Sequence, residues 1–543
     1  MTESDGTIDG SLTLYGSSLQ PLLTAIDQQG SAEVLESLAM TIQLSGTRNN
    51  LFISPLQASL VVAGDRIPNS PVTLEINADT RVDLDQETLS IESFSLQGLG
   101  LDASGRISAS RIFDAPEFEG QLELASFNLR RLLQQLNQPV PATTDDSVLQ
   151  QVGFNTEFRG STENIELNNL VVSIDDSVLR GNVTLSDFTE LAIKFNLEID
   201  QLDVDRYLPP ETTQSQDDTD STRTEIPREQ LANLNVHGQL QANSLSVAGM
   251  DFTEFSLTVN AENGQLDLGP ISTNLYQGSF EGNFHLSVAD AVPVARFDAN
   301  LRQIDLDLLL LDLMDATYLS GNGNVEITLT SSGSDTDAMI NNLNGNGRIE
   351  LEDGVFTGVD VASVLGQVET MLRSRRPAEL QRGQQTAFDS FSGTMVISNG
   401  VVNTNDLLIM SPGFQVTGRG TLLDLNNETI RFDLITSVDE ATATRDDQEF
   451  DIGGYSLPIA CNGTLSAPRC LPDAGEIIRG VLAREVQRRL GGFLERALGI
   501  GDPQPAEPST DGDQDTQFQQ EPEPEPVNPT DDLINRALDR IFN

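Results

Sequence analysis

The stretch LAIKFNLEID, residues 191–200, decides the fold class of this chain because apolar residues alternate with mostly polar ones along it. A period of two predicts an antiparallel strand with one buried face and one wet face. Turn pairs such as Asp353-Gly354 and Asn399-Gly400 separate similar runs at hairpin spacing. We therefore expect a mainly β fold: a long curved antiparallel meander sheet forming an apolar groove, with short interspersed helices and a C-terminal amphipathic helix.

The apolar members of the alternating runs are the candidate lining of this groove. They share one spacing and come from four separate parts of the chain. The candidates are Ile193, Phe195, Leu197, Ile199, Phe255, Leu257, Val259, Val325, Ile327, Leu329, Ile430, Phe432 and Leu434.

Longer repeats combine strand, connection, strand and a glycine-centred crossing into a third strand. Gly105, Gly181, Gly282 and Gly418 fall at equivalent places in four such repeats. A glycine inside a strand marks a bulge or a close backbone approach, so we expect the sheet to curve there.

A second signature ends strand-like segments: a small capping residue, an apolar residue, two variable positions and two apolar residues. Ser, Asn and Asp suit a helix N-cap, and the apolar spacing predicts one stripe of a short helix. The five copies begin at Ser18, Asn128, Asp203, Asp305 and Asp360. We interpret them as short helices at the edges of one continuous sheet.

The charge of the chain excludes some functions. Its 543 residues carry a formal net charge of -52, which argues against nucleic acid as a partner and disfavours broad adhesion to anionic lipid headgroups. No apolar run is long enough to span a bilayer, and the polar N-terminus MTESDGTIDG is not a signal peptide. Since the first strand-like segment resembles the end of a repeat, we expect that the chain is truncated before Met1.

Two cysteines, Cys461 and Cys470, flank turn signals at Asn462-Gly463 and Pro468. The segment could fold back and form a disulfide across a tight loop, or the two thiols could be free and buried. A metal site is not expected, because two cysteines without a nearby histidine cannot complete a zinc shell.

Composition shifts divide the chain into six parts. The segment from Glu476 to Leu498 has an apolar helical stripe punctuated by arginines, and two interpretations stay open: it caps the open end of the sheet, or it lies on a membrane surface. The parts are 1–208, the N-terminal part of the β-groove; 209–227, an acidic linker; 228–472, the C-terminal β-groove region; 473–500, the amphipathic helix; 501–529, a disordered acidic Pro-rich linker; and 530–543, a short terminal amphipathic helix.

Residues suited to catalysis are sparse. His237 and His285 both lie in strand-like runs, and Gly321-Asn322-Gly323 and Gly345-Asn346-Gly347 lack the lysine and helix of a phosphate loop. We expect no enzyme, no cofactor and no metal.

Several of these stretches together resemble the AsmA family of bacterial envelope proteins. They include LEIDQLDVDRYLPP with the acidic linker after it, LNGNGRIELEDGVFTGVDVASVL and LPIACNGTLSAPRCLPD, and the resemblance covers most of residues 190–500. It implies a periplasmic protein, held at the inner membrane by an N-terminal helix; we expect that truncation has removed this helix from this chain. It also implies a groove that carries phospholipid toward the outer membrane, with membrane surfaces or membrane proteins at its ends.

Two functions follow as expectations. The first is a groove that binds and conducts phospholipid between the two membranes and so supports outer-membrane biogenesis. The alternative is an assembly or regulatory factor for targeting outer-membrane proteins, which would bind protein segments along the sheet.

Overall fold

A computed structural model describes residues 6–16, 35–62, 71–210, 225–314, 319–357, 385–438, 456–464 and 467–472. The chain divides into two compact units. Unit 1 comprises residues up to Arg302 together with Ile327–Asn342, and unit 2 comprises Gln303–Glu326 and the residues from Leu343 onward. Both ends of the acidic linker belong to unit 1, so the boundary between the units lies elsewhere.

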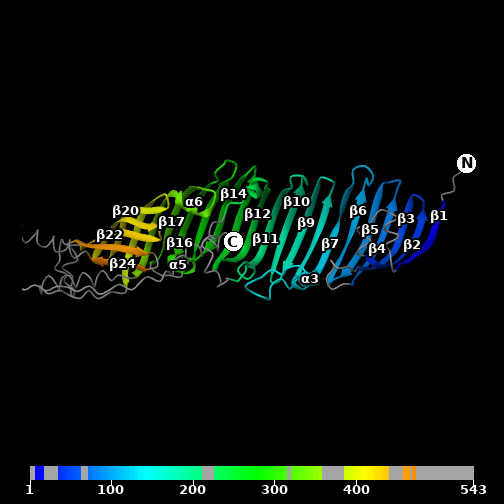
Figure 1. Ribbon diagram of the computed structural model, residues 1–543, viewed down its shortest axis with the longest axis horizontal. Helices are drawn as coiled ribbons and strands as arrows, with labels where there is room; N and C mark the ends of the chain where they lie inside the picture. The colour runs from blue at the N-terminus through cyan, green and yellow to red at the C-terminus, as the bar shows by residue number, and fades with distance from the viewer. Residues whose placement is uncertain are drawn as a thin grey trace, which may run out of the picture. The chain divides into compact units, whose positions relative to one another are not determined.

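Unit 1 is built from strands that lie side by side (Figure 1). Apart from one pair, each strand is antiparallel to the next in the chain, which confirms the predicted meander. The strands are β1 (Thr7–Gly16), β2 (Leu35–Thr47), β3 (Asn50–Val62), β4 (Val72–Asp83), β5 (Thr88–Gly98), β6 (Leu101–Ser110), β7 (Glu117–Phe127), β8 (Val152–Gly160), β9 (Asn164–Ile174), β10 (Ser177–Ser186), β11 (Ala192–Asp203), β12 (Asn235–Val247), β13 (Met250–Glu262), β14 (Gln265–Leu275), β15 (Gly278–Ser287) and β16 (Val294–Asp305), whose last residues belong to unit 2.

The exception is the pair β11–β12, which is parallel, with Ala192 opposite Asn235 and Asp203 opposite Ser246. At this one pair the sheet departs from the antiparallel pattern of the meander. A parallel neighbour requires the chain to return to the starting edge of the sheet, which takes a long connection. The connection here contains the acidic linker and helix α4 (Arg228–Ala232), so the linker separates two strands that are direct neighbours.

Unit 2 continues the same architecture with β18 (Asn344–Thr357), β19 (Gln385–Ser398), β20 (Val401–Ser411), β21 (Phe414–Asp424), β22 (Thr429–Val438), β23 (Ser456–Thr464) and β24 (Ala467–Pro472). Every consecutive pair is antiparallel. Strand β17 (Leu319–Ser332) is divided between the units, as is the chain around it. The apolar face of unit 2 forms a core, since Leu351, Val416 and Ile459 are at most 2% exposed.

Short helices follow strands at two of the predicted places. Helix α3 (Leu129–Gln135) begins after Asn128, whose side chain accepts a hydrogen bond of 2.8 Å from the backbone N–H of Arg131. Helix α5 (Leu306–Met314) follows Asp305, whose side chain accepts a hydrogen bond of 3.1 Å from the backbone N–H of Asp307. A further short helix, α6 (Thr336–Asn341), is capped by Asp335. The copies that begin at Ser18 and Asp360 lie outside the described residues, as does the C-terminal amphipathic helix.

The copy at Asp203 is not a helix, and that prediction is wrong. Val204 donates its N–H to the carbonyl of Ser246 at 2.9 Å, and Tyr207 closes a single turn on Val204. The carboxylate of Asp205 accepts from the N–H groups of Ala248 and Gly249 at 2.7 and 2.8 Å. These bonds to the neighbouring strand and its turn replace the bonds that a helix would make.

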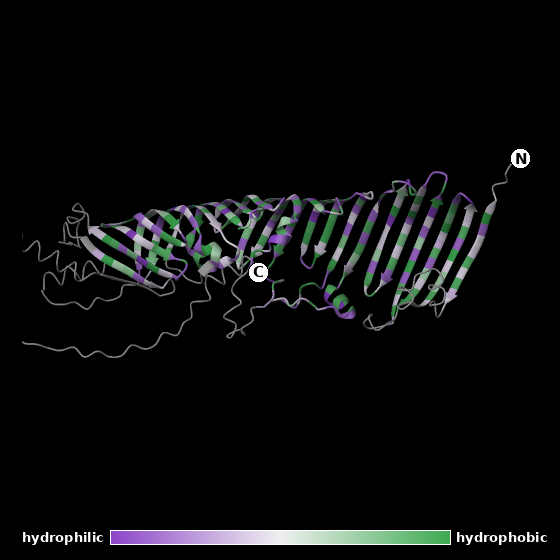
Figure 2. Ribbon diagram, turned by 45° about the horizontal axis from the view of Figure 1, so that its top comes forward, coloured by the Kyte–Doolittle hydropathy of each residue, from purple (hydrophilic) through white to green (hydrophobic). Residues whose placement is uncertain are grey.

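Along each strand, hydrophobic and hydrophilic positions alternate (Figure 2). The predicted bulges are present: the register shifts at Gly181, and the strands opposite Gly105, Gly282 and Gly418 each shift beside the glycine. A bulge adds a residue to one strand and therefore changes which residues face each side. The shifts keep the apolar residues on one face of the sheet, whereas strict alternation without a bulge would turn some of them to the opposite face.

Candidate functional site

The candidate site is the apolar face of the sheet, and β11 shows how it is built. Ile193, Phe195 and Leu197 are half-buried, whereas the intervening side chains of Lys194 and Asn196 are exposed. Since successive residues of a strand point to opposite faces, β11 presents an apolar face that is partly open and a polar face in water.

A transverse row through Phe195 crosses unit 1 from β1 to β16. Residues directly opposite one another in paired strands share a face, so the row can be followed from register to register. Fifteen spacings of about 4.8 Å make it about 70 Å long. In strand order β1 to β16 its members are Gly10, Leu44, Ile53, Thr80, Ile91, Ile107, Gly120, Phe158, Leu167, Val183, Phe195, Gly238, Val259, Leu268, Phe284 and Phe297.

A second row, through Ile199, is apolar at every one of its positions. It runs from β1 to β13 through Leu14, Met40, Ala58, Ile76, Leu96, Ala103, Leu124, Phe154, Val172, Leu179, Ile199, Ala242 and Phe255. Together the rows make an apolar band across unit 1, interrupted by one threonine in the first row.

These registers bring the sequence-predicted residues of β11 and β13 together. Val259 lies in the row of Phe195, and Phe255 lies in the row of Ile199. Leu257 follows in the row of Leu197, through Leu240 of β12. The candidates from these two strands therefore occupy one face of one unit.

Glycines occupy positions of this face where an aromatic ring from the neighbouring strand lies against the backbone. A Cβ at Gly238 would lie 2.6 Å from Cγ of Phe195, and one at Gly120 would lie 2.7 Å from Cζ of Phe158. Both distances are far below van der Waals contact. The glycines thus leave room for rings that lie along the sheet.

The candidates of β17 and β22 have different surroundings. Val325, Ile327 and Leu329 are half-buried at alternate positions of β17. In β22, Ile430 and Leu434 are buried, at 6% and 5% exposed.

Unit 2 contains an apolar hollow, and Phe432 and Leu434 are part of its lining. Its empty volume is about 660 Å³, which includes the part open to solvent. The other lining residues are Leu319, Phe356, Thr386, Phe391, Leu407, Ile409, Val416 and Leu422. Sequence reasoning missed these eight residues, although the alternation in DLLIM (406–410) and FQV (414–416) indicated an apolar face there.

The polar face of unit 1 collects both histidines in one transverse row: Lys194, His237, Asn260, Asp267, His285 and Arg296. Nδ1 of His285 lies 2.6 Å from Asp267, and His237 contacts Asn260 and Asn235. These are cross-strand pairs on a solvated surface. Among the described residues, no group of three or more His, Cys, Asp or Glu side chains is arranged to hold a metal ion.

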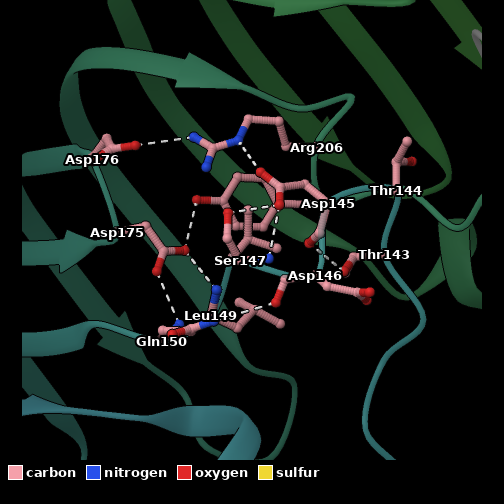
Figure 3. A network of polar contacts seen from close by, with 12 residues as sticks. Thr143, Thr144, Asp145, Asp146, Ser147, Leu149, Gln150, Asp175, Asp176 and Arg206 are labelled. Carbon is pink, nitrogen blue, oxygen red and sulfur yellow. Dashed lines mark hydrogen bonds and ion pairs between the residues drawn. The ribbon is translucent and has the colours of Figure 1, made fainter.

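A polar network at the end of β11 holds the chain where the acidic linker departs (Figure 3). Arg206 binds the carboxylates of Asp145 at 2.9 Å and Asp176 at 3.1 Å. Thr144 donates both its N–H and its hydroxyl to the carbonyl of Leu208, at 2.7 and 2.8 Å. The loop after α3 and the β9–β10 turn therefore fix residues 204–208, a role that sequence reasoning did not foresee.

Two groups of the network have shifted pKa values. Hydrogen bonds from the side chain and backbone of Ser147, and then from Arg206, lower the pKa of Asp145 to about 2. Burial, followed by the hydrogen bond that its hydroxyl donates to Asp175, raises the pKa of Tyr207 to about 12. Each group is thereby held in the state found at neutral pH, which is expected of a structural anchor.

The two cysteines lie at the far edge of unit 2. Cys461 is disulfide-bonded and 1% exposed. The backbone of Cys470 is directly opposite it in the register of β23 and β24.

Within the described residues, no helix has the length and apolar character needed to cross a bilayer.

The sequence model of the AsmA family matches residues 119–407, which is more than half of the chain. Protein AsmA of Escherichia coli (strain K12) is 21% identical to this chain over 476 residues, covering 81% of this chain and 74% of that protein. The matched region contains the apolar band from β7 to β16 and the polar network around Arg206. The chain therefore belongs to the AsmA family.

Proposed function

We propose that this protein is a non-enzymatic groove that binds phospholipid through its acyl chains and conducts it between the inner and outer membranes, supporting outer-membrane biogenesis. In this proposal it acts in the periplasm, in association with the inner membrane. The observation that carries the proposal is the apolar band, which continues from strand to strand through unit 1 with half-buried side chains.

The size of the band suits an acyl chain. From Ile193 to Ile199 the apolar face covers six residue steps, or about 20 Å along the strand. One leaflet of a bilayer has about 15 Å of hydrocarbon, half of the usual core. An acyl chain laid along a strand would fit within the band, with its headgroup in water at the edge.

The energetic need for such a surface is large. An acyl chain of about 16 methylenes exposed to water costs about 0.8 kcal/mol per methylene, or about 13 kcal/mol. An apolar band that contacts the chain throughout its path would remove much of this barrier. Because successive strands present similar apolar side chains along each row, movement of an acyl chain from one strand to the next would cost little free energy.

Photo-crosslinking tests where the ligand lies. The photoreactive p-benzoylphenylalanine would replace Leu257 on the apolar face, and Thr258 would be replaced as the control on the opposite face of the same strand. We expect phospholipid adducts at position 257 and none at 258, as read by mass spectrometry. Protein adducts at 257 would instead support the alternative, a factor that binds segments of outer-membrane proteins.

A substitution tests binding itself. Leu197→Asp places a carboxylate on the apolar face, whereas Asn196→Asp adds the same charge to the exposed face. Burying a charge against an acyl chain is strongly unfavourable, so we expect several-fold less co-purified phospholipid for Leu197→Asp only. Equal lipid content in the two variants, or a wild-type protein free of lipid, would refute the proposal.

A further inference from the structure

The apolar hollow of unit 2 is lined mainly by buried or half-buried apolar side chains. Phe391, Leu407, Ile409 and Leu434 line it and are between 5% and 9% exposed. The hollow also reaches Leu319, Phe356 and Thr386, which lie where β17 and β19 begin and β18 ends. These three positions lie at the same end of neighbouring strands, so the hollow extends to that end of the strands.

The last described strand of unit 2, β24, runs toward this same end of the strands. Strand β24 ends at Pro472, which is opposite Ile459, and Ile459 is opposite Leu434. At about 4.8 Å per strand, the end of β24 is about 10 Å from a residue that lines the hollow. Whatever follows Pro472 therefore starts beside the hollow.

We propose that residues 476–498 of this chain dock on the apolar hollow of unit 2. Their sequence predicts an amphipathic helix with five arginines and three glutamates. The apolar stripe consists of Ile477, Ile478, Val481, Leu482, Val486, Leu490, Phe493, Leu494 and Leu498.

The dimensions agree. Twenty-three helical residues extend over about 34 Å. The seven strands from β18 to β24 cover six spacings, or about 29 Å. A helix that starts next to β24 and runs across the strands would therefore reach from one side of unit 2 to the other.

Tethering and charge favour this occupant. Three residues separate Pro472 from Glu476, and a short tether gives an effective concentration in the millimolar range. The segment has a net charge of +2, from five Arg and three Glu, in a chain of net charge -52. With its apolar stripe toward the hollow, its arginines would remain on the outer side within the field of the acidic chain.

This inference does not rest on lipid transport, because the segment and the hollow belong to one chain. If both proposals hold, the segment and an acyl chain would compete at Phe432 and Leu434. Lipid-free full-length protein therefore tests the docking alone, and its result is independent of the lipid adducts at position 257.

The first experiment is intramolecular crosslinking in the full chain. We would place p-benzoylphenylalanine at Leu422, which lines the hollow, and at the exposed Gln415 of the same strand as the control. The expected result is a crosslink from 422 to a peptide within 476–498 at monomer mass, and none from 415. A crosslink at dimer mass, a crosslink to another segment, or none from 422 would overturn the inference.

The second experiment perturbs the segment. Val486→Asp with Leu490→Asp disrupts the stripe, and Gln487→Asp adds one charge beside it as the control. We expect the double variant to lose the crosslink from 422 and to speed hydrogen exchange several-fold in β20–β22, while the control matches wild type. Unchanged crosslinking and exchange in the double variant would show that the segment does not occupy the hollow.

Discussion

Gly418 allows a quantitative test of packing in unit 2. It lies in β21 between Leu407 of β20 and Leu434 of β22, directly opposite both. A Cβ at Gly418 would lie 2.7 Å from Cδ2 of Leu407 and 2.9 Å from Cδ2 of Leu434. Both leucines are 5% exposed and pack in the face that lines the hollow, so a Cβ at Gly418 would force one or both of these side chains to shift.

Gly418→Ala should therefore destabilise unit 2. Adding a methyl group to a packed core costs about 1–3 kcal/mol, and alanine regains about 0.5–1 kcal/mol of the glycine entropy cost. The net loss therefore lies between about 0 and 2.5 kcal/mol, with a central value of about 1 kcal/mol. Gly10→Ala in β1 is the matched control, because a Cβ there meets nothing within 4 Å, and it should be neutral or stabilising by about 0.5–1 kcal/mol.

The assay is equilibrium unfolding in urea followed by far-UV circular dichroism, with hydrogen exchange locating the loss in β20–β22. A double-mutant cycle assigns its cause. Leu407→Ala alone should cost about 2–5 kcal/mol, and combined with Gly418→Ala it should cost about 1–3 kcal/mol less than the sum. Full stability of Gly418→Ala, or strict additivity with Leu407→Ala, would refute the packing argument.

Three further predictions concern the polar network and the disulfide. Because the folded pKa of Asp145 is depressed to about 2, its stabilising contribution is present above about pH 4 and is lost as the pH falls toward 2; Asp145→Asn should flatten that part of an acid-unfolding curve. The folded pKa of Tyr207 is raised to about 12, so its contribution is full below about pH 10 and is lost as the pH rises through 12. Tyr207→Phe should remove this alkaline loss, and an unchanged alkaline limb would count against the hydrogen bond to Asp175. Replacing Cys461 and Cys470 by serine opens a loop of about ten residues and should cost about 3 kcal/mol in urea unfolding; a stability equal to wild type, with and without reductant, would contradict this.

Local structure was predictable wherever neighbouring residues decide it. The alternation in β11, β13 and β22 specified strands, because a one-sided apolar pattern of period two is buried efficiently only in a sheet. Asn128 and Asp305 precede helices as expected, since a side-chain cap is a local interaction.

The same signature failed at Asp203 because distant residues compete there. Ser246, Ala248 and Gly249 offer backbone partners to the segment after β11, and they do so only because β12 lies parallel to β11. Nothing within residues 203–208 reports that neighbour. The anchor at Arg206 was missed for the same reason, as Asp145 is 61 residues away in the chain.

The amino-acid sequence by itself determined that this protein is a β-sheet with one apolar face, that glycines bend it, and which family it resembles. Only the tertiary structure decided how the apolar residues line up. Phe195 is opposite Val183 in one neighbour and Gly238 in the other, and each bulge shifts the register by a residue that no local pattern counts. The row of sixteen strands in unit 1 and the hollow of unit 2 depend on the sum of these registers, because hydrogen bonding between strands, and not spacing along the chain, sets which side chains share a face.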